Sequence, residues 1–336
     1  MNNYLFDFHC NLPDIKDVRV RLNGREYTLC PVTDQTTGAL ESPTLGEFTN
    51  QQISLLREEK HLRTAETYHC ATKRFLNYLG HDIALCKIDR QLIQSYERFL
   101  RAEGLISNSS SFHMRVLRAI YNKAVKNHII SDNIPFCDVY TGIGKTIKRA
   151  LPIDIIHRIA QLNNLNCHEI FARDMFLFSF YTRGMSFIDM SFLKTQQIRN
   201  GYLLYTRHKT GQQLVIKWES CMQDIVNRYN TSTPYLLPII KRCNGNERSQ
   251  YREAQRKVNG TLKSIGQKAG ITIPLSMYVA RHSWASIARN MDVPLSIISE
   301  GMGHTSEHTT RIYLKSLSTR RLDSISAAII QAVKQD

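Results

Sequence analysis

The sequence of 336 residues lacks any long apolar run. Its longest, FLFSFY at residues 176–181, is far shorter than the roughly 20 residues that a membrane-spanning helix needs. The N-terminal MNNYLFDFHC also lacks the basic flank and apolar core that are typical of a secretion signal. We therefore expect a cytoplasmic protein that does not associate with a membrane.

The closely spaced cysteine pairs of zinc sites and disulfide frameworks are missing too. Eight cysteines are scattered along the chain without a CxxC pair: Cys10, Cys30, Cys70, Cys86, Cys137, Cys167, Cys221 and Cys243. With this spacing we expect reduced thiols and no metal site. The sequence also has no internal repeat of about 20–50 residues, which argues against a solenoid or a propeller.

Positive charge, in contrast, is present in excess. The chain has 44 Lys+Arg against 29 Asp+Glu, a formal net charge of +15. Only 22% of the residues are charged, so the excess is spread over folded sequence rather than held in a disordered tail. This composition favours a polyanionic partner, nucleic acid before membrane. The length predicts two domains, and the 42% hydrophobic content is enough for a core in each.

The first 43 residues differ in pattern from the rest. Residues 18–22 and 25–29 alternate in polarity around Asn23-Gly24, the strongest short signal for a β-hairpin. A polar linker follows the hairpin. The hairpin is either an additional DNA-binding arm or a packing embellishment, and we favour the second interpretation.

Residues 44–138 have the periodicity of a helical domain. Thr64 and Asp89 are candidate N-caps for two of its helices. A third helix is predicted at 109–126, with one apolar face: Phe112, Val116, Ile120 and Ala124. The opposite face carries a hydroxyl, two guanidiniums and an amide: Ser111, Arg115, Arg118 and Asn122. Such a stripe is either a solvated face or a set of donors for DNA phosphates and base edges, and the basic chain favours DNA.

Residues 139–152 predict an interdomain linker with exposed basic side chains, Lys145, Lys148 and Arg149. Its GKT triplet is not a phosphate-binding loop, because Val139 occupies the position of the required first glycine. From residue 153 the pattern is mixed. We predict a strand pair at 201–218, and helices at 168–181, 219–229, 252–269, 277–290 (capped by Ser276), 294–301, 309–314 and 322–333.

Three local patterns in this second half carry chemical groups. YVARHSWA at 278–285 places Tyr278 and Arg281 one helical turn apart, so a phenol and a guanidinium can converge on one anion. GMGHTSEHTTRIYLKS at 301–316 places His304 nine residues before Tyr313. TRHKTG at 206–211 predicts that Arg207 and Lys209 project from the same side of a strand.

These patterns resemble those of the tyrosine recombinases, the phage-integrase family of DNA strand-exchange enzymes. RHSWA resembles the second-arginine box, GH with Tyr nine residues later resembles the histidine–nucleophile box, and HKTG lies where the family has its hairpin lysine. The likeness covers roughly residues 44–325. It implies a mainly α fold with a small β-sheet, arranged as a two-domain clamp. A helical core-binding domain (44–138) precedes a mixed α/β catalytic domain (153–336), whose last helix docks on a neighbouring protomer.

Two positions depart from the family pattern. In YTRGMSFIDMS at 181–191, Ser186 occupies the place of the first arginine, and Tyr278 occupies the place of the histidine in the second box. A branch of integrases and invertases from bacterial mobile elements resembles this chain in having the serine, and Asp189 still matches the family's acidic position. Arg183 and Arg207 are both candidates to supply the missing guanidinium, and the sequence does not choose between them.

The resemblance implies a role for each matching residue. Tyr313 is the expected nucleophile, Arg281 the main phosphate clamp, His304 a second phosphate ligand or proton carrier, and Lys209 the general acid. The chemistry explains this set, because attack on a phosphodiester builds negative charge on its oxygens that fixed cations must stabilise. The leaving 5′-oxygen needs a proton, and the 3′-phosphotyrosine product retains the bond energy for rejoining. Neither a metal nor a cofactor is required.

We therefore expect a site-specific DNA recombinase, an integrase or invertase of a mobile element. Its expected partners are double-stranded DNA, further copies in a homotetramer on paired sites, and accessory DNA-bending proteins, all in the cytoplasm at the nucleoid. A catalytically impaired DNA-binding protein or repressor is the alternative that Ser186 and Tyr278 favour. A relaxing topoisomerase uses the same chemistry and is a third possibility.

Overall fold

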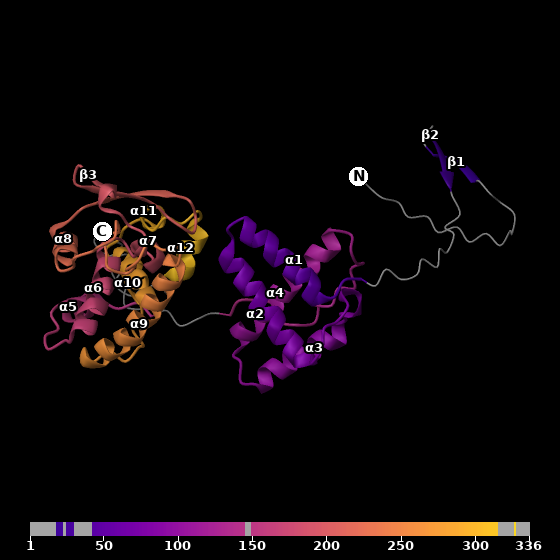
Figure 1. Ribbon diagram of the computed structural model, residues 1–336, viewed down its shortest axis with the longest axis horizontal. Helices are drawn as coiled ribbons and strands as arrows, with labels where there is room; N and C mark the ends of the chain where they lie inside the picture. Colours follow the sequence, from indigo (N-terminus) through magenta and orange to yellow (C-terminus); the bar gives the residue numbers. More distant parts are fainter. Residues whose placement is uncertain (1–17, 23–24, 30–41, 145–148, 315–325, 327–336) are drawn as a thin grey trace, which may run out of the picture. The chain divides into compact units, whose positions relative to one another are not determined.

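The structure is a computed structural model that describes residues 18–22, 25–29, 42–144, 149–314 and 326 (Figure 1). The chain divides into two compact units, Met1–Lys145 and Thr146–Asp336, and each helical unit has its own hydrophobic core. At the start of the chain, β1 (Val18–Leu22) and β2 (Arg25–Leu29) pair antiparallel as predicted.

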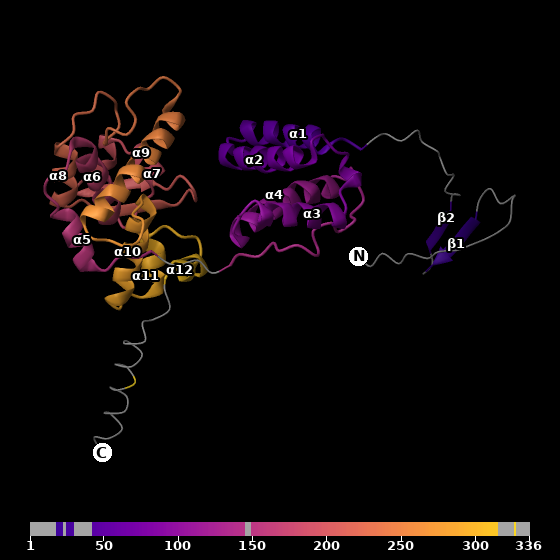
Figure 2. The same cartoon turned by 90° about the horizontal axis from the view of Figure 1, so that it is seen from below.

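The helical part of the first unit consists of four helices in two layers. Figure 2 shows α1 and α2 in one layer and α3 and α4 in the other. Their bounds are α1 Leu45–Glu58, α2 Leu62–Leu79, α3 Arg90–Ala102 and α4 Ser107–Lys126, with a short 3₁₀ turn at Leu85–Lys87. Large side chains such as Phe75, Tyr96 and Tyr121 fill the space between the layers and are fully buried. Asp89 caps α3 as predicted, because its Oδ1 accepts from the Leu92 amide at 2.8 Å.

Two expectations for this unit are wrong. Thr64 is not a cap, since α2 already begins at Leu62, two residues before it. Phe112 is 40% exposed rather than buried, because Ser111 and Met114 take the covered positions in that turn of α4. The other three residues of the predicted apolar face, Val116, Ile120 and Ala124, are buried.

The second unit is built around the buried helix α6 (Cys167–Tyr181), against which α9 (Glu247–Lys268) and α10 (Met277–Asn290) pack. The other helices are α5 Ile153–Ala160, α7 Phe187–Ser191, α8 Ser220–Asn227, α11 Leu295–Gly301 and α12 Glu307–Tyr313. An antiparallel sheet in the order β3-β4-β5 is formed by Ile198–Arg199, Tyr202–Thr206 and Gln213–Lys217. Alternate strand residues turn inward to the core: Leu203, Tyr205, Leu214 and Ile216.

The helix bounds of this unit differ from the predicted ones mainly where the sequence is polar. α9 begins five residues earlier than predicted, because its first turn has no apolar periodicity. α8 ends two residues before the predicted end, and α12 begins two residues before the predicted start. The helix predicted at 322–333 lies outside the described residues, apart from Ser326.

No helix within the described ranges is long and apolar enough to cross a membrane. The six cysteines of the described part, from Cys70 to Cys243, all have free thiols. In the same part, no three His, Cys, Asp or Glu side chains are grouped as a metal site would need.

Candidate active site

Arg281 lies at the centre of the site, on the buried side of α10. Its guanidinium donates from Nη1 to the Gly184 carbonyl at 2.6 Å and from Nη2 to the Met302 carbonyl at 2.7 Å. Gly184 has φ +74°, and a Cβ there would lie only 2.7 Å from the Arg281 Cα. Glycine at 184 therefore allows the turn after α6 to pack directly on α10, and that contact fixes the position of Arg281.

His304 is hydrogen-bonded to the same guanidinium. Arg281 Nη2 lies 2.9 Å from His304 Nε2, and since arginine only donates, Nε2 must be the acceptor. The ring proton is then on Nδ1, which donates to Thr310 Oγ1 at 2.8 Å. Burial, together with the charges of Arg281, Arg207 and Lys209, lowers the pKa of His304 to about 3. The imidazole is therefore neutral at pH 7 and connects Arg281 to α12.

Arg207 brings a second buried guanidinium to this point. Its Nη1 donates to the carbonyl of Gly303, the residue after Met302, so two arginines converge on consecutive carbonyls. The predicted strand position of Arg207 and Lys209 is wrong, because β4 ends at Thr206 and both residues lie in the turn that follows. That turn is closed by the Arg207 amide, which donates to the Gln212 carbonyl at 2.8 Å.

Asp189 connects the start of α7 to this turn. Ser186 Oγ donates to Asp189 Oδ2 at 2.6 Å, and Asp189 Oδ1 accepts from the His208 amide at 2.8 Å. The carboxylate is buried, so these two contacts hold the turn that carries Lys209. The family resemblance identified Asp189 as the acidic position, but the sequence contained no signal for its partner, a backbone amide.

These groups surround a pocket of about 250 Å³. Its polar lining comes from four separate segments of the chain: Ser186, Arg207, Lys209, Gln255, Asn259, Ser276, Tyr278 and Arg281. Tyr278 is 53% exposed and lies edge-on to the His282 ring, with centroids 4.5 Å apart. Arg183 is not among the lining residues; its Cδ lies beside Gly301 of α11 instead.

The N-terminus of α10 is capped from a neighbouring helix. Ser276, the predicted cap, makes no side-chain capping bond. Asn259 of α9 takes this role, since its Oδ1 accepts from the Met277 amide at 2.9 Å. Asn259 and Gln255 are site residues that the sequence analysis missed, because no local spacing relates α9 to the motif on α10.

Tyr313 is the last residue of α12, and only its backbone is part of the description. α12 packs against α10 and α11, and the buried Thr310, one turn before Tyr313, bonds to His304. The helix that carries the predicted nucleophile is therefore connected through His304 to Arg281.

The polar stripe on α4 is partly covered by the chain itself. Ser111 Oγ donates to the Gly142 carbonyl at 2.5 Å, and Arg118 Nη1 donates to Thr141 Oγ1 at 2.9 Å. Arg115 donates weakly to a carbonyl of its own helix, whereas Asn122 is exposed. The linker residues Lys145 and Lys148 lie outside the described residues. DNA binding by this stripe stays a prediction.

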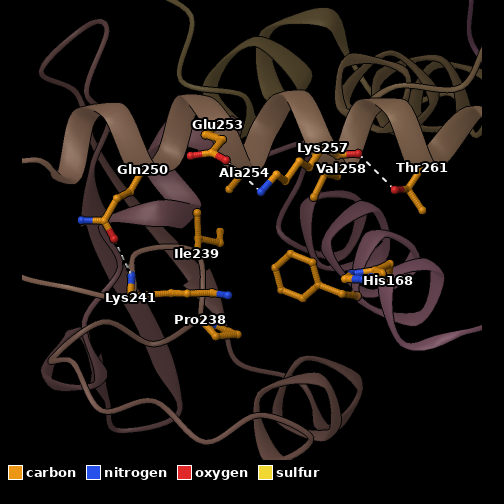
Figure 3. Close-up of a pocket in the computed structure, with 11 residues that line it drawn as sticks. His168, Pro238, Ile239, Lys241, Gln250, Glu253, Ala254, Lys257, Val258 and Thr261 are labelled. Atoms are coloured by element: carbon orange, nitrogen blue, oxygen red, sulfur yellow. Dashed lines mark hydrogen bonds and ion pairs between the residues drawn. The ribbon is translucent and has the colours of Figure 1, made fainter.

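A separate pocket of about 260 Å³ lies between α6, α9 and the loop before α9 (Figure 3). Phe171, Ile239 and Val258 form its apolar wall, and Lys241 and Lys257 are among its polar residues. It shares no lining residue with the active-site pocket, so it belongs to a different face of α9.

The chain thus consists of two units, and the second unit contains the pocket that Arg207, Lys209 and Arg281 line. Two family models match its consecutive parts: the phage integrase SAM-like domain at residues 44–139 and the phage integrase family at residues 151–320. The second match spans half of the chain. The chain therefore belongs to the phage integrase family, the tyrosine-type site-specific DNA recombinases.

Known proteins are similar over most of their length. Tyrosine recombinase XerC of Rickettsia bellii is 22% identical over 254 residues, covering 72% of this chain and 81% of that protein. Tyrosine recombinase XerD of Staphylococcus aureus is 24% identical over 281 residues, covering 78% and 92%.

Solved structures share the fold at low identity. A lambda integrase (75-356) dimer bound to a COC′ core site has a TM-score of 0.61 at 15% identity, covering 82% of this chain and 97% of that one. The Tn1549 transposon integrase in complex with a circular intermediate DNA has a TM-score of 0.60 at 13% identity, covering 86% and 99%. A lambda integrase tetramer bound to a Holliday junction has a TM-score of 0.59 at 16% identity, covering 82% and 78%.

Proposed function

We propose that this protein cuts and rejoins double-stranded DNA at specific sites through a 3′-phosphotyrosine intermediate, as the integrase or invertase of a mobile element. The observation that carries the proposal is the convergence of Arg281 and Arg207 on the consecutive carbonyls of Met302 and Gly303, beside the pocket that Lys209 lines. Two fixed guanidiniums next to one pocket suit the doubly charged transition state of phosphodiester cleavage.

Each residue has one task in the proposed reaction. The Tyr313 phenol loses its proton to solvent as its oxygen forms a bond to phosphorus. The bond from phosphorus to the 5′-oxygen breaks, and Lys209 gives that oxygen a proton. Arg281 and Arg207 stabilise the charge on the non-bridging oxygens, with Arg183 as the second candidate for the missing arginine. Tyr278 contributes a phenol donor at the pocket, and His304 orients Arg281 through the hydrogen bond that its Nε2 accepts.

The proposed assembly is a homotetramer on paired DNA sites, supported by the similarity to a lambda integrase tetramer bound to a Holliday junction. The similarity to a transposon integrase and the serine at position 186 support the mobile-element role. We propose that residues 44–138 bind the DNA core, with α4 and the linker making contacts through Arg115, Arg118, Asn122, Lys145 and Lys148. Residues 139–152 would then link this domain to the catalytic domain, 153–336, in a clamp. Accessory DNA-bending proteins and a cytoplasmic, nucleoid-associated location belong to this proposal.

A nicked suicide duplex that carries a verified site tests the reaction. The sites are sought as inverted repeats or attachment sequences in the DNA that flanks the coding region. We expect a covalent protein–DNA adduct that Tyr313→Phe abolishes while DNA binding is retained. Binding without an adduct would favour the repressor that Ser186 and Tyr278 suggest, and relaxed circles without exchanged strands would indicate a topoisomerase.

A further inference from the structure

His208, the residue before Lys209, is attached to α7 at two points. Its backbone amide donates to Asp189 Oδ1 at 2.8 Å. Its imidazole stacks on the ring of Phe192, with the ring centroids 6.0 Å apart and an angle of 11° between the planes. Asp189 and Phe192 are three residues apart at the end of α7, so they lie next to each other on one side of it. His208 therefore binds α7 through both its backbone and its side chain.

The α7 side of this contact is itself held in place. The Asp189 carboxylate is buried, and its second oxygen accepts from Ser186 Oγ at 2.6 Å. The Phe192 ring packs edge-on against the rings of Tyr235 and Tyr251, at centroid distances of 5.7 and 5.9 Å. Tyr235 precedes α9 and Tyr251 lies on it. Segments distant from α7 in the sequence therefore fix the ring on which the imidazole stacks.

Lys209 depends on this attachment because its own side chain is exposed at the edge of the pocket that it lines. The turn that carries it is closed by the bond from the Arg207 amide to the Gln212 carbonyl, which shapes the turn locally. Two further contacts join the turn to other segments: the Arg207 guanidinium donates to Gly303, and His208 binds α7. The direction in which the Lys209 side chain leaves the backbone is therefore set by both contacts.

We propose that His208 is a positioning residue, which holds the turn against α7 so that the Lys209 ammonium meets the 5′-oxygen of the cleaved DNA strand. Its imidazole acts by stacking on Phe192 and transfers no proton itself. The inference rests on the proposed function for the role of Lys209 as general acid. A pair of packed aromatic rings shifts an equilibrium by a factor of about 2–10. Loss of the imidazole should reduce the fraction of correctly placed Lys209 by a factor in this range.

A suicide duplex with sulfur in place of the bridging 5′-oxygen tests this role. The Tyr313 oxygen bonds to phosphorus, the bond from phosphorus to sulfur breaks, and the sulfur leaves as a thiolate. A thiolate is a far weaker base than an alkoxide, so it leaves without a proton. His208→Ala should cleave the ordinary duplex about three- to tenfold more slowly and the sulfur duplex at the normal rate. Lys209→Ala is the reference for a lost general acid, slowed by about 10²–10⁴ on the ordinary duplex alone.

Two further variants serve as controls in the same single-turnover measurement. His208→Phe keeps a ring that can stack on Phe192, so it should cleave the ordinary duplex within about twofold of the normal rate. Thr206→Ala is the matched control, since Thr206 is an exposed residue of the same hairpin, two positions before His208. Equal slowing of His208→Ala on both duplexes would overturn the positioning role. So would a His208→Phe variant as slow as the alanine variant, or the same loss in Thr206→Ala.

The attachment is also measurable without any cleavage, which separates failure of this inference from failure of the proposed function. Amide hydrogen exchange in peptides that span residues 203–214 of the DNA-free full chain should be about three- to tenfold faster in His208→Ala and normal in His208→Phe. Faster exchange in a protein that forms no adduct would retain the attachment and remove the cleavage reaction. Adduct formation with unchanged exchange and unchanged cleavage rates in His208→Ala would retain the recombinase and overturn the inference.

Discussion

Ser186 donates its hydroxyl hydrogen to Asp189 and brings no charge to the pocket, at the position where the family resemblance predicts an arginine. The pocket nevertheless contains a second guanidinium. Arg207 is buried in its wall beside Gly303, whereas Arg183 lies against Gly301 and does not line the pocket. At the scale of single residues, we therefore propose Arg207 as the replacement, because it lines the pocket and Arg183 does not.

We expect Arg207→Ala to slow cleavage of the suicide duplex by about 10²–10³, the usual loss for one transition-state donor. Arg183→Ala should cleave at nearly the normal rate. Arg207 also donates to the Gly303 carbonyl, so the alanine variant removes both this hydrogen bond and the positive charge at the pocket. Arg207→Lys separates these two roles, because lysine keeps the charge but loses the planar guanidinium group. Single-turnover adduct formation measures the rates, and thermal midpoints check folding. If both alanine variants cleave normally, neither arginine replaces the missing one.

His304 gives the protein a specific pH dependence. Its pKa is about 3 in the folded protein, against about 6.5 when unfolded. Between these two pH values, His304 binds a proton in the unfolded chain but not in the folded protein. The free energy of unfolding is therefore at its full value above about pH 6.5, as far as His304 is concerned, and decreases as the pH falls below it. Each pH unit in this window removes at most about 1.4 kcal/mol.

We therefore expect the free energy of unfolding to drop by about 2 kcal/mol more between about pH 6.5 and pH 5 in the unaltered protein than in His304→Gln. Urea unfolding followed by tryptophan fluorescence measures this, because Trp218 and Trp284 both lie in the second unit. Parallel pH profiles for the two proteins would show that His304 is not the group responsible.

At the scale of elements, the turn between α6 and α7 packs closely on α10. Gly184 and Gly201 both have left-handed φ values, +74° and +76°, but only a Cβ at 184 collides with another element. Gly201→Ala should therefore lose about 1–2 kcal/mol of stability from backbone strain alone. Gly184→Ala should lose about 1–3 kcal/mol more, because it also separates α10 from the turn. Urea unfolding of the pair measures the difference, and equal losses would argue against the close contact at Arg281.

For the molecule as a whole, the sequence predicted what depends on local periodicity and missed what depends on contacts between distant segments. The bounds of α10 matched the prediction because its apolar spacing is regular, whereas the fold class followed from the resemblance of three short motifs to those of the tyrosine recombinases. The bond from Asn259 to Met277 and the convergence on Met302 and Gly303 had no local signal. A strand and the turn after it also look alike in sequence, which is why Arg207 was assigned to the strand.

A further prediction for the whole molecule concerns the segment at the end of the first unit, which is bound to α4. The Asn108 side chain of α4 makes two hydrogen bonds with Gly144: it donates to the Gly144 carbonyl at 3.2 Å and accepts from the Gly144 amide at 2.7 Å. Arg118 contacts Thr141 in the same segment and is also a predicted DNA ligand. The α4 face thus either binds the chain's own linker only, or binds the linker and DNA together.

Two variants on α4 separate these roles. Asn108→Ala should speed trypsin cleavage after Lys145, Lys148 or Arg149 by about tenfold, because about 1.4 kcal/mol of closing free energy is lost with its hydrogen bonds. Its DNA salt dependence should not change, since an amide neutralises no phosphate. Arg118→Ala should weaken DNA binding and make the salt slope shallower by about 0.9, because a phosphate contact is lost. The exposed Asn122→Ala is the control for trypsin cleavage. If Arg118→Ala accelerates cleavage like Asn108→Ala and leaves the salt slope unchanged, the α4 face holds the linker and does not bind DNA.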